Sequence, residues 1–145
     1  MTFYAKRFDE LTTVELYEIL RSRYEIFTLE QNIYYQDMDG VDYDSLHCFL
    51  VEGGRVVGYL RAYIAEEHAD SVKMGRVLSL RHGVGIGTEL MERSIEAIKE
   101  KLPCNRIYIS SQKHAVGFYE RFGFSIISDE FLEAGVVHLK MVREV

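Results

Sequence analysis

Glycines alternate with other residues at positions 83, 85 and 87 of the chain, inside the segment Arg81 to Thr88. A β-rich run at Val72 to Leu80 leads into this segment, and a run with helical spacing follows it. In such a turn the backbone N–H groups can converge on phosphate oxygens, because glycine has no Cβ, and the helix N-terminus adds a positive dipole end. The segment could therefore bind a diphosphate. Tight turns and close packing also use glycines, so both interpretations stay open at this point.

Two familiar phosphate-binding motifs do not fit this segment. A P-loop ends in Gly-Lys-Ser or Gly-Lys-Thr, and neither sequence occurs here. A dinucleotide-binding fingerprint normally follows the first strand of a parallel unit and has an acidic residue for the ribose about 20 residues later. The glycines therefore need a different context to be interpreted.

A second segment, His114 to Phe124, supplies that context, because its Phe-Tyr pair is followed by Gly-Phe. The two segments together resemble the GNAT acetyltransferase superfamily. Its diphosphate motif reads Q/R-x-x-G-x-G/A, where Gly85 and Gly87 take the glycine positions and His82 departs from Q/R. Its later helix often reads A-x-x-F-Y-x-x-x-G-F, which is matched here by residues 115 to 124. Gln112 stands where many members carry Asn.

Further residues, spread over nearly the full chain, resemble the ElaA-like subgroup of this superfamily. They are Arg23 to Phe27, Glu30, Gln31, Tyr35, Gln36, Asp39, Gly40, Asp42, His47, Gly75, Arg76, Gly135, His138 and Met141. The resemblance implies an α/β GNAT fold, in which helices cover both faces of a mixed, mostly antiparallel sheet of six to seven strands. It also implies transfer of an acetyl group from acetyl-CoA to a primary amine of a small molecule or peptide, through a tetrahedral intermediate and without a metal.

The same resemblance implies a set of cofactor-binding residues along one strand, the glycine turn and the later helix. They are Val77, Leu78, Ser79, His82, Gly83, Val84, Gly85, Ile86, Gly87, Thr88, Gln112, Phe118 and Tyr119. The first three would bind the pantetheine arm through free backbone groups. One of their N–H groups would also stabilise the oxyanion, which can be worth about 3 kcal/mol.

Catalysis by such an enzyme requires a base and an acid. A lysine-like amine has a pKa of about 10.4, so it must lose a proton before it can attack, and the departing thiolate must gain one. The resemblance implies that Tyr119 is the general acid, although a Phe-Tyr pair on a helix can also be core packing. Glu30, His47 and His138 are the candidate bases. A histidine on a strand is more often a hydrogen-bonded core or rim residue, so the three stay as alternatives.

Two other functions remain open from the residues alone. One is a non-catalytic acyl-CoA-binding module that keeps the turn and the pantetheine strand but lacks a working acid and base. The other is a nucleotide-binding regulatory domain that uses the glycine turn for another phosphate ligand. Tyr119 favours an enzyme over the first, and the Phe-Tyr motif argues against the second.

Length and composition favour one domain over residues 1–145, because 145 residues with 48% hydrophobic content can bury a single core. A net charge of −6 without a basic run argues against nucleic acid and suits a cationic amine. No apolar run reaches membrane-spanning length, so we expect a cytoplasmic protein; a homodimer is left open. Cys48 and Cys104 match no metal spacing and are expected to be buried thiols. The aspartates at 37, 39, 42 and 44 do not match a calcium loop and predict a solvated acidic loop.

The helices and strands follow from periodicity and from Gly and Pro signals. Thr12 or Thr13 is expected to cap the first helix, Gly53 and Gly54 to make a hairpin turn, Pro103 to end the second helix, and Gly123 to end the third. The predicted strands span 3–8, 47–52, 55–64, 72–80, 106–111, 124–131 and 136–142, and the predicted helices 13–29, 88–101 and 115–122. Glu66, Glu67 and His68 are predicted to be the polar end of a strand.

Overall fold

The computed structural model describes residues 1–65 and 70–145, so the prediction for Glu66 to His68 lies outside the described residues. The strands are β1 (Thr2–Arg7), β2 (Leu46–Glu52), β3 (Arg55–Ile64), β4 (Ser71–Ser79), β5 (Arg106–Gln112), β6 (Ser125–Ile126), β7 (Phe131–Glu133) and β8 (Val136–Glu144). The helices are α1 (Thr13–Arg23), a π-helix (Tyr24–Glu30), α2 (Ile86–Lys101) and α3 (Val116–Glu120), with 3₁₀ turns at Phe8–Glu10, Val41–Asp44 and Lys113–Ala115.

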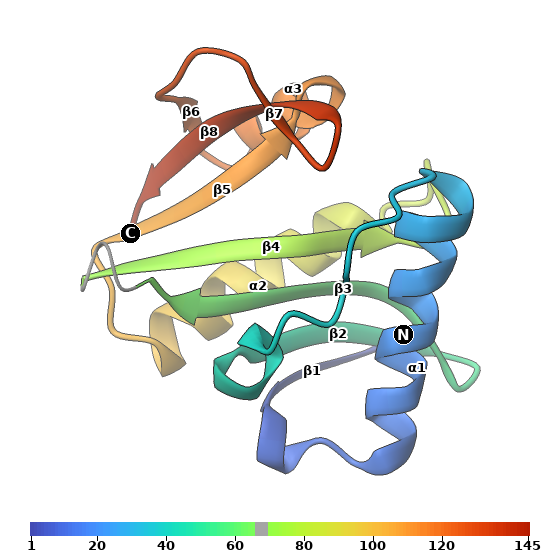
Figure 1. The fold of residues 1–145 in the computed structure, drawn as a ribbon. Helices are drawn as coiled ribbons and strands as arrows, with labels where there is room; N and C mark the ends of the chain where they lie inside the picture. Colours follow the sequence, from blue (N-terminus) through green and yellow to red (C-terminus); the bar gives the residue numbers. More distant parts are fainter. Residues whose placement is uncertain (66–69) are drawn as a thin grey trace.

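All eight strands form one twisted sheet in the order β1-β2-β3-β4-β5-β8-β6, with β7 also paired to β8 (Figure 1). Every pairing is antiparallel except that of β4 with β5, which α2 connects. The predicted mixed, mostly antiparallel sheet is therefore confirmed. The run expected as one strand at 124–131 is two short strands, β6 and β7, which raises the number of strands to eight.

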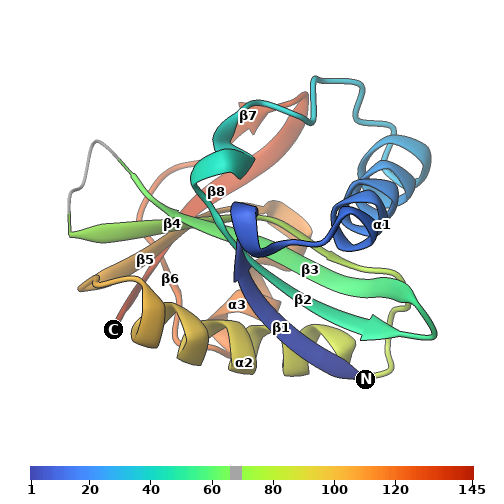
Figure 2. The ribbon, with the colours of Figure 1, turned by 90° about the horizontal axis from the view of Figure 1, so that it is seen from below.

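Helices cover both faces of the sheet, as expected (Figure 2). On one face α2 and α3 pack over the larger core, which includes Leu90 and Ile98 of α2 and Met74 of β4. On the other face α1 and the π-helix bury Ile19 and Ile26 in a smaller core. The apolar residues of α2 recur at helical spacing because one stripe of the helix faces the sheet.

Most local signals for the element ends act as predicted. The exception is α3, which ends at Glu120 and not at 122, although Gly123 does take a positive φ of +86°. Thr12 caps α1 in a capping box with Glu15, and its Oγ1 accepts from the Glu15 backbone N–H at 3.0 Å. Gly53 and Gly54 turn the β2–β3 hairpin with φ values of +58° and +78°. The first helix nevertheless changes character at its end, because residues 24–30 form a π-helix instead of continuing the α-helix.

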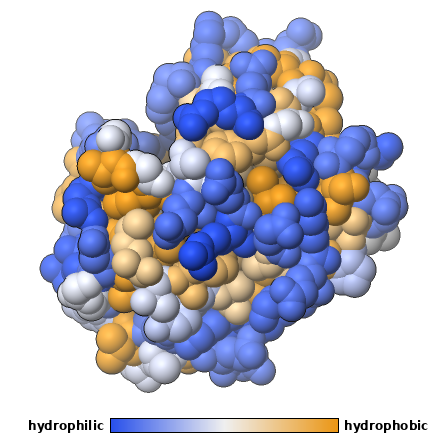
Figure 3. Space-filling model, turned by 180° about the vertical axis from the view of Figure 1, so that it is seen from behind, coloured by the Kyte–Doolittle hydropathy of each residue, from blue (hydrophilic) through white to orange (hydrophobic). Residues whose placement is uncertain are grey.

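On the face drawn in Figure 3, hydrophilic side chains surround smaller apolar areas. Cys48 is fully buried and Cys104 is partly buried; both are free thiols. Among the described residues, no helix combines the length and the apolar character needed to cross a membrane.

An ion-pair network replaces the solvated acidic loop expected at Asp37 to Asp44, and this expectation is wrong for three of the four aspartates. The fully buried Arg23 contacts Asp37 at 2.9 Å and Asp42 at 2.7 Å. Arg61 pairs with Asp39 at 2.7 Å and Asp42 at 3.0 Å, and Arg76 pairs with Asp37 at 2.8 Å. Only Asp44 is exposed without such a partner. The network fastens the loop after the π-helix to β3 and β4.

The network makes stability sensitive to acid. The Arg61 hydrogen bond holds the pKa of Asp39 well below its usual range. Burial alone would raise the pKa of Asp42, but the hydrogen bonds and charges of Arg23 and Arg61 outweigh it and lower that pKa. Because unfolded aspartates titrate near 3.9, this stabilisation is present at neutral pH and is lost as the pH falls below about 5 towards the folded values.

We expect Asp42→Asn to destabilise the protein at pH 7 by about 3 to 5 kcal/mol, because two buried guanidinium groups lose their shared carboxylate. Urea unfolding at pH 7 measures this loss. The same titration repeated down to about pH 3 should show a shallower pH dependence for the variant than for the native protein. Asp44→Asn, on the same turn, is the control and should stay within about 0.5 kcal/mol. Equal effects of the two substitutions would contradict this role of the network.

Candidate active site

Strands β4 and β5 separate along part of their length (Figure 1). A cleft lies there, lined by residues of both strands. The two strands pair in parallel only from Ser71–Arg106 to Met74–Ile109. Beyond Met74, β4 stays paired to β3, with a register shift that coincides with a positive φ of +52° at Arg76. The β5-facing edge of β4 is therefore without a ladder partner from Gly75 onward, and its backbone polar groups are available to a ligand.

The cleft has a volume of about 500 Å³ and extends from the π-helix to the β7–β8 hairpin. The residues used below that line it are Gln31, Lys73, Arg76, Val77, Gln112, His114, Tyr119, Glu133 and His138. Of the predicted site residues, the structure thus brings Val77, Gln112, Tyr119 and His138 together in one cavity.

The glycine turn lies at the far end of β4 and forms the N-terminus of α2. Gly83 and Gly85 have φ values of +75° and +80°, which a residue with a Cβ adopts only under strain. Gly85 is the N-cap and offers no side chain, so the first amides of the 16-residue helix α2 have no capping partner. A Cβ on Gly87 would stand 3.2 Å from the Phe118 ring, so close packing with α3 also requires a glycine. Close packing thus accounts for Gly87, and the uncapped amides leave the diphosphate interpretation open.

The three predicted pantetheine residues lie in different surroundings. Val77 lines the cleft, whereas the Leu78 side chain is buried in the smaller core. The Ser79 hydroxyl donates to the carbonyl of Arg81 at 2.8 Å and so stabilises the start of the turn. Of these three residues, only Val77 lines the cavity.

Tyr119 lies at the inner side of the cleft, on α3. Only 7% of the residue's surface is exposed. Its ring makes edge contacts with Phe118 and Phe124, at centroid distances of 5.2 Å and 6.0 Å. Burial raises the pKa of its hydroxyl above the ordinary value, so the group keeps its proton at neutral pH. It packs in the core and also lines the cavity, so both interpretations considered for it stay open.

His138 is the candidate base that lines the cleft. Its Nδ1 lies 2.7 Å from the carbonyl oxygen of Val136, which can only accept, so this nitrogen carries the proton. The neutral ring therefore has its lone pair on Nε2, which lies 3.6 Å from a carboxylate oxygen of Glu133. Phe131 stacks on the ring at 6.0 Å between centroids and fixes its plane.

The other two candidate bases do not line the cleft. His47 is fully buried: its Nε2 donates to the Asp42 carbonyl at 2.9 Å, and its Nδ1 accepts from the Tyr59 hydroxyl at 2.7 Å. Burial lowers the pKa of His47, which disfavours its charged form. Glu30 is exposed at the end of the π-helix, where its carboxylate meets His82 at 3.4 Å. This contact joins the π-helix to the glycine turn.

Several residues in the cleft, and Arg121 beside the glycine turn, were not assigned to the site from the sequence. Gln31 accepts a hydrogen bond at 2.9 Å from Gln112, so the two amides bridge the π-helix and β5. Arg121 donates to the Thr88 hydroxyl at 3.4 Å and places a cation beside the first turn of α2. Glu133 and Lys73 belong to no recognised motif. The contacts of Gln31 and Arg121 join segments far apart in the chain, and a lone glutamate or lysine forms no motif, so the sequence alone did not place these residues in the site.

Comparison with known proteins agrees with this geometry. A family model of the acetyltransferase (GNAT) domain matches residues 19–145. The chain is 34% identical to protein ElaA of Escherichia coli (strain K12) over 142 residues, which cover 94% of this chain and 92% of ElaA.

Two solved structures are similar over 99% of this chain and 99% of their own. The crystal structure of an acyl-CoA N-acyltransferase from Pseudomonas aeruginosa superposes with a TM-score of 0.91 at 34% identity. The crystal structure of Escherichia coli ElaA also superposes with a TM-score of 0.91, at 31% identity. The chain therefore belongs to the GNAT acetyltransferase family, as an acyltransferase related to ElaA.

Proposed function

We propose that the protein transfers an acetyl group from acetyl-CoA to a primary amine of a small molecule or peptide. One observation carries the proposal: the unpaired edge of β4 leads from the cleft at Tyr119 to the glycine turn that begins α2. A ligand with a diphosphate at one end, amides along its length and a thioester at the other end matches the glycine turn, the edge of β4 and the cleft, in that order.

The residues present suit such a ligand. The uncapped amides of α2 after Gly85, with Arg121 beside them, would hold the diphosphate. The free edge of β4 at Val77 would pair with the amides of the pantetheine arm. The side-chain amides of Gln31 and Gln112, which bond each other across the cleft, could exchange that bond for contacts to the same arm. Open space lies beside Gly83 and Gly85, where no atom stands within 4 Å of a Cβ position.

Acetyl-CoA would supply the activated acetyl group, which passes to the amine nitrogen as the coenzyme A thiol is released. In this proposal His138 takes the proton of the incoming ammonium at Nε2, and Glu133 stabilises the charged ring that results. Tyr119 holds its proton at neutral pH and delivers it to the departing sulfur. His47 and Glu30 are left with structural roles, because neither lines the cleft.

A non-catalytic acyl-CoA-binding module is the second function considered from the sequence. It would need no proton donor or acceptor beside the thioester position. Tyr119 and His138 both line the same cavity, which favours an enzyme. Release of free thiol from acetyl-CoA on addition of an amine panel tests the function directly, and absence of release with unimpaired cofactor binding would leave only the binding module.

Gly85→Ala should weaken acetyl-CoA binding by at least about tenfold, because an alanine at φ +80° shifts the amides that begin α2. Gly54→Ala is the matched control, since Gly54 has a φ of +78° in the hairpin turn, away from the cleft. The two variants should lose similar stability in thermal unfolding, and only Gly85→Ala should lose affinity in calorimetric titration. Equal affinities would argue against the turn as the diphosphate site.

Tyr119→Phe should lower kcat by about a hundredfold or more while the dissociation constant of acetyl-CoA changes less than about twofold. The ring and its contacts with Phe118 and Phe124 remain, and only the donated proton is lost. Thiol-release kinetics and calorimetry give the two numbers. Equal losses of turnover and affinity would mean that the hydroxyl serves binding instead of proton transfer.

His138→Gln should lower the rate strongly at pH 7 and progressively less towards pH 10, because amines with a pKa near 10.4 increasingly arrive deprotonated. A pH profile of kcat/KM from pH 6.5 to 10 checks this. His114→Gln also changes a histidine of the cleft, and its deficit should not depend on pH. A deficit of His138→Gln that stays constant with pH would exclude His138 as the base.

A further inference from the structure

Most charged groups that line the cleft neutralise one another. Arg61 and Arg76 form ion pairs with Asp37 and Asp39. The same network includes the buried pair Arg23 and Asp42. Three guanidinium groups thus meet three carboxylates, so this network adds no net charge to the cavity. An acceptor would sense the remaining ionisable side chains.

Lys73 is a cleft-lining cation outside that network. It lies on β4, is half-buried, and forms no ion pair with any residue in the described ranges 1–65 and 70–145. The sheet register places it between Tyr63 on β3 and Tyr108 on β5, which flank it on the same face. A half-buried ammonium without a counter-ion favours an anion that can approach it through the cleft.

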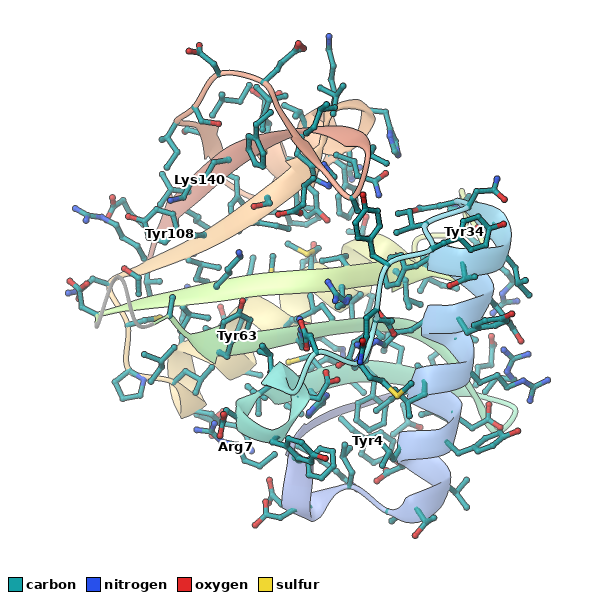
Figure 4. The ribbon with its side chains drawn as sticks, viewed as in Figure 1. Tyr4, Arg7, Tyr34, Tyr63, Tyr108 and Lys140 are labelled. Atoms are coloured by element: carbon teal, nitrogen blue, oxygen red, sulfur yellow. The ribbon has the colours of Figure 1, made fainter. Side chains whose placement is uncertain are left out.

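The position of Lys73 separates it from the cofactor end of the cleft. It stands at the start of β4, whereas the glycine turn follows Ser79 at the end of that strand, roughly 20 Å away at about 3.3 Å per residue. Figure 4 shows the neighbouring Tyr63, Tyr108 and Lys140 toward this same end of the sheet. An anion at Lys73 therefore belongs to the acceptor and not to the diphosphate of the cofactor.

The opposite charge lies across the cleft on the β7–β8 hairpin. Glu133 is half exposed, and its only described ion pair is the 3.6 Å contact with His138 Nε2. A carboxylate beside the proposed base attracts an ammonium. It also stabilises the positive charge that His138 acquires when it takes a proton from that ammonium. The cavity thus offers an anion-binding group on β4 and a cation-binding pair on the hairpin.

From this arrangement, and resting on the proposed function, we propose that the acceptor is a zwitterion: a primary amine that also carries a carboxylate bound by Lys73. An amino acid or a short peptide has this chemistry. A single ammonium matches the single charge of a carboxylate, whereas a phosphate monoester carries nearly two charges at neutral pH and would call for further donors. The acceptor ammonium loses one proton to His138, and the free amine then forms the C–N bond. As the C–S bond breaks, the thiolate takes a proton from Tyr119, and the second proton lost by the nitrogen restores the Tyr119 hydroxyl.

Matched amines with and without the carboxylate test the proposal. We would measure kcat/KM by thiol release at saturating acetyl-CoA for lysine and cadaverine, ornithine and putrescine, and phenylalanine and phenethylamine. At least one carboxylate-bearing member should exceed its partner by about tenfold or more, as expected for a charge-assisted hydrogen bond. Lys73→Met should remove that preference and leave the dissociation constant of acetyl-CoA unchanged.

Lys140→Met is the matched control. Lys140 lies on β8 with its Nζ 5.0 Å from the centre of the Tyr108 ring, and it does not line the cleft. It changes the net charge by the same amount on the same part of the sheet, so the preference should survive in this variant. Loss of the preference in both variants would indicate long-range attraction and overturn a direct contact at Lys73.

Other outcomes are equally decisive. Equal or better turnover of the decarboxylated amines in all three pairs overturns the proposal, and so does a preference for phosphoethanolamine over all three amino acids. If acetyl-CoA binds but no amine reacts, each amino acid and its decarboxylated amine are titrated into the complex of the protein with coenzyme A, and their dissociation constants are compared. Equal affinities, or no binding of either member, count against a zwitterionic acceptor. If acetyl-CoA itself does not bind, the proposed function fails, and titration into the free protein still tests Lys73.

Discussion

The separation of β4 from β5 is the constraint on which the site depends. The two strands pair over four residues each, and the pairing stops where the bulge at Arg76 turns β4 away. A buried strand edge with unpaired N–H and C=O groups is unfavourable unless something bonds to it. The open edge therefore has a ready partner in any extended ligand that carries amides. The fold creates this open edge by interrupting its own sheet.

The ion-pair network gives the opening a stable shape. Arg61 on β3 and Arg76 on the bulge are both tied to the loop at 37–42, which Arg23 anchors to the end of α1. Breaking such buried pairs is costly, and their geometry specifies one arrangement of the loop more than it adds stability. Because the network is internally neutral, the few cleft charges outside it determine what the cavity attracts. Lys73 and Glu133 stand out for that reason.

Local sequence signals predicted the elements well and long-range contacts poorly. The double glycine at 53 and 54, the cap at Thr12 and the stop at Pro103 act on neighbouring residues, so their effects could be read directly. The aspartates of the loop looked solvated because their arginine partners are 14 to 39 positions away in the chain.

The candidate site shows the same division. The motif match led to Tyr119 and the glycine turn, because both lie in short contiguous patterns. It could not distinguish His138 from His47, since only tertiary structure places one ring in the cleft and the other between Asp42 and Tyr59. The strand expected at 124–131 is interrupted because its middle residues do not continue a regular ladder: the Ile127 N–H and the Ser128 hydroxyl bond to Lys140, and only β6 and β7 pair with β8 as strands.

The sheet order also divides the strands into two groups that share one core. Strands β1 to β4 pair as neighbours in sequence, whereas β5 pairs with the last strand, β8, to which β6 and β7 also pair. The short parallel seam between them closes only after α2 has crossed over, which is a late and entropically expensive step. We therefore expect the β1–β4 meander to assemble early during folding and the opening between β4 and β5 to appear last, when the two groups of strands dock.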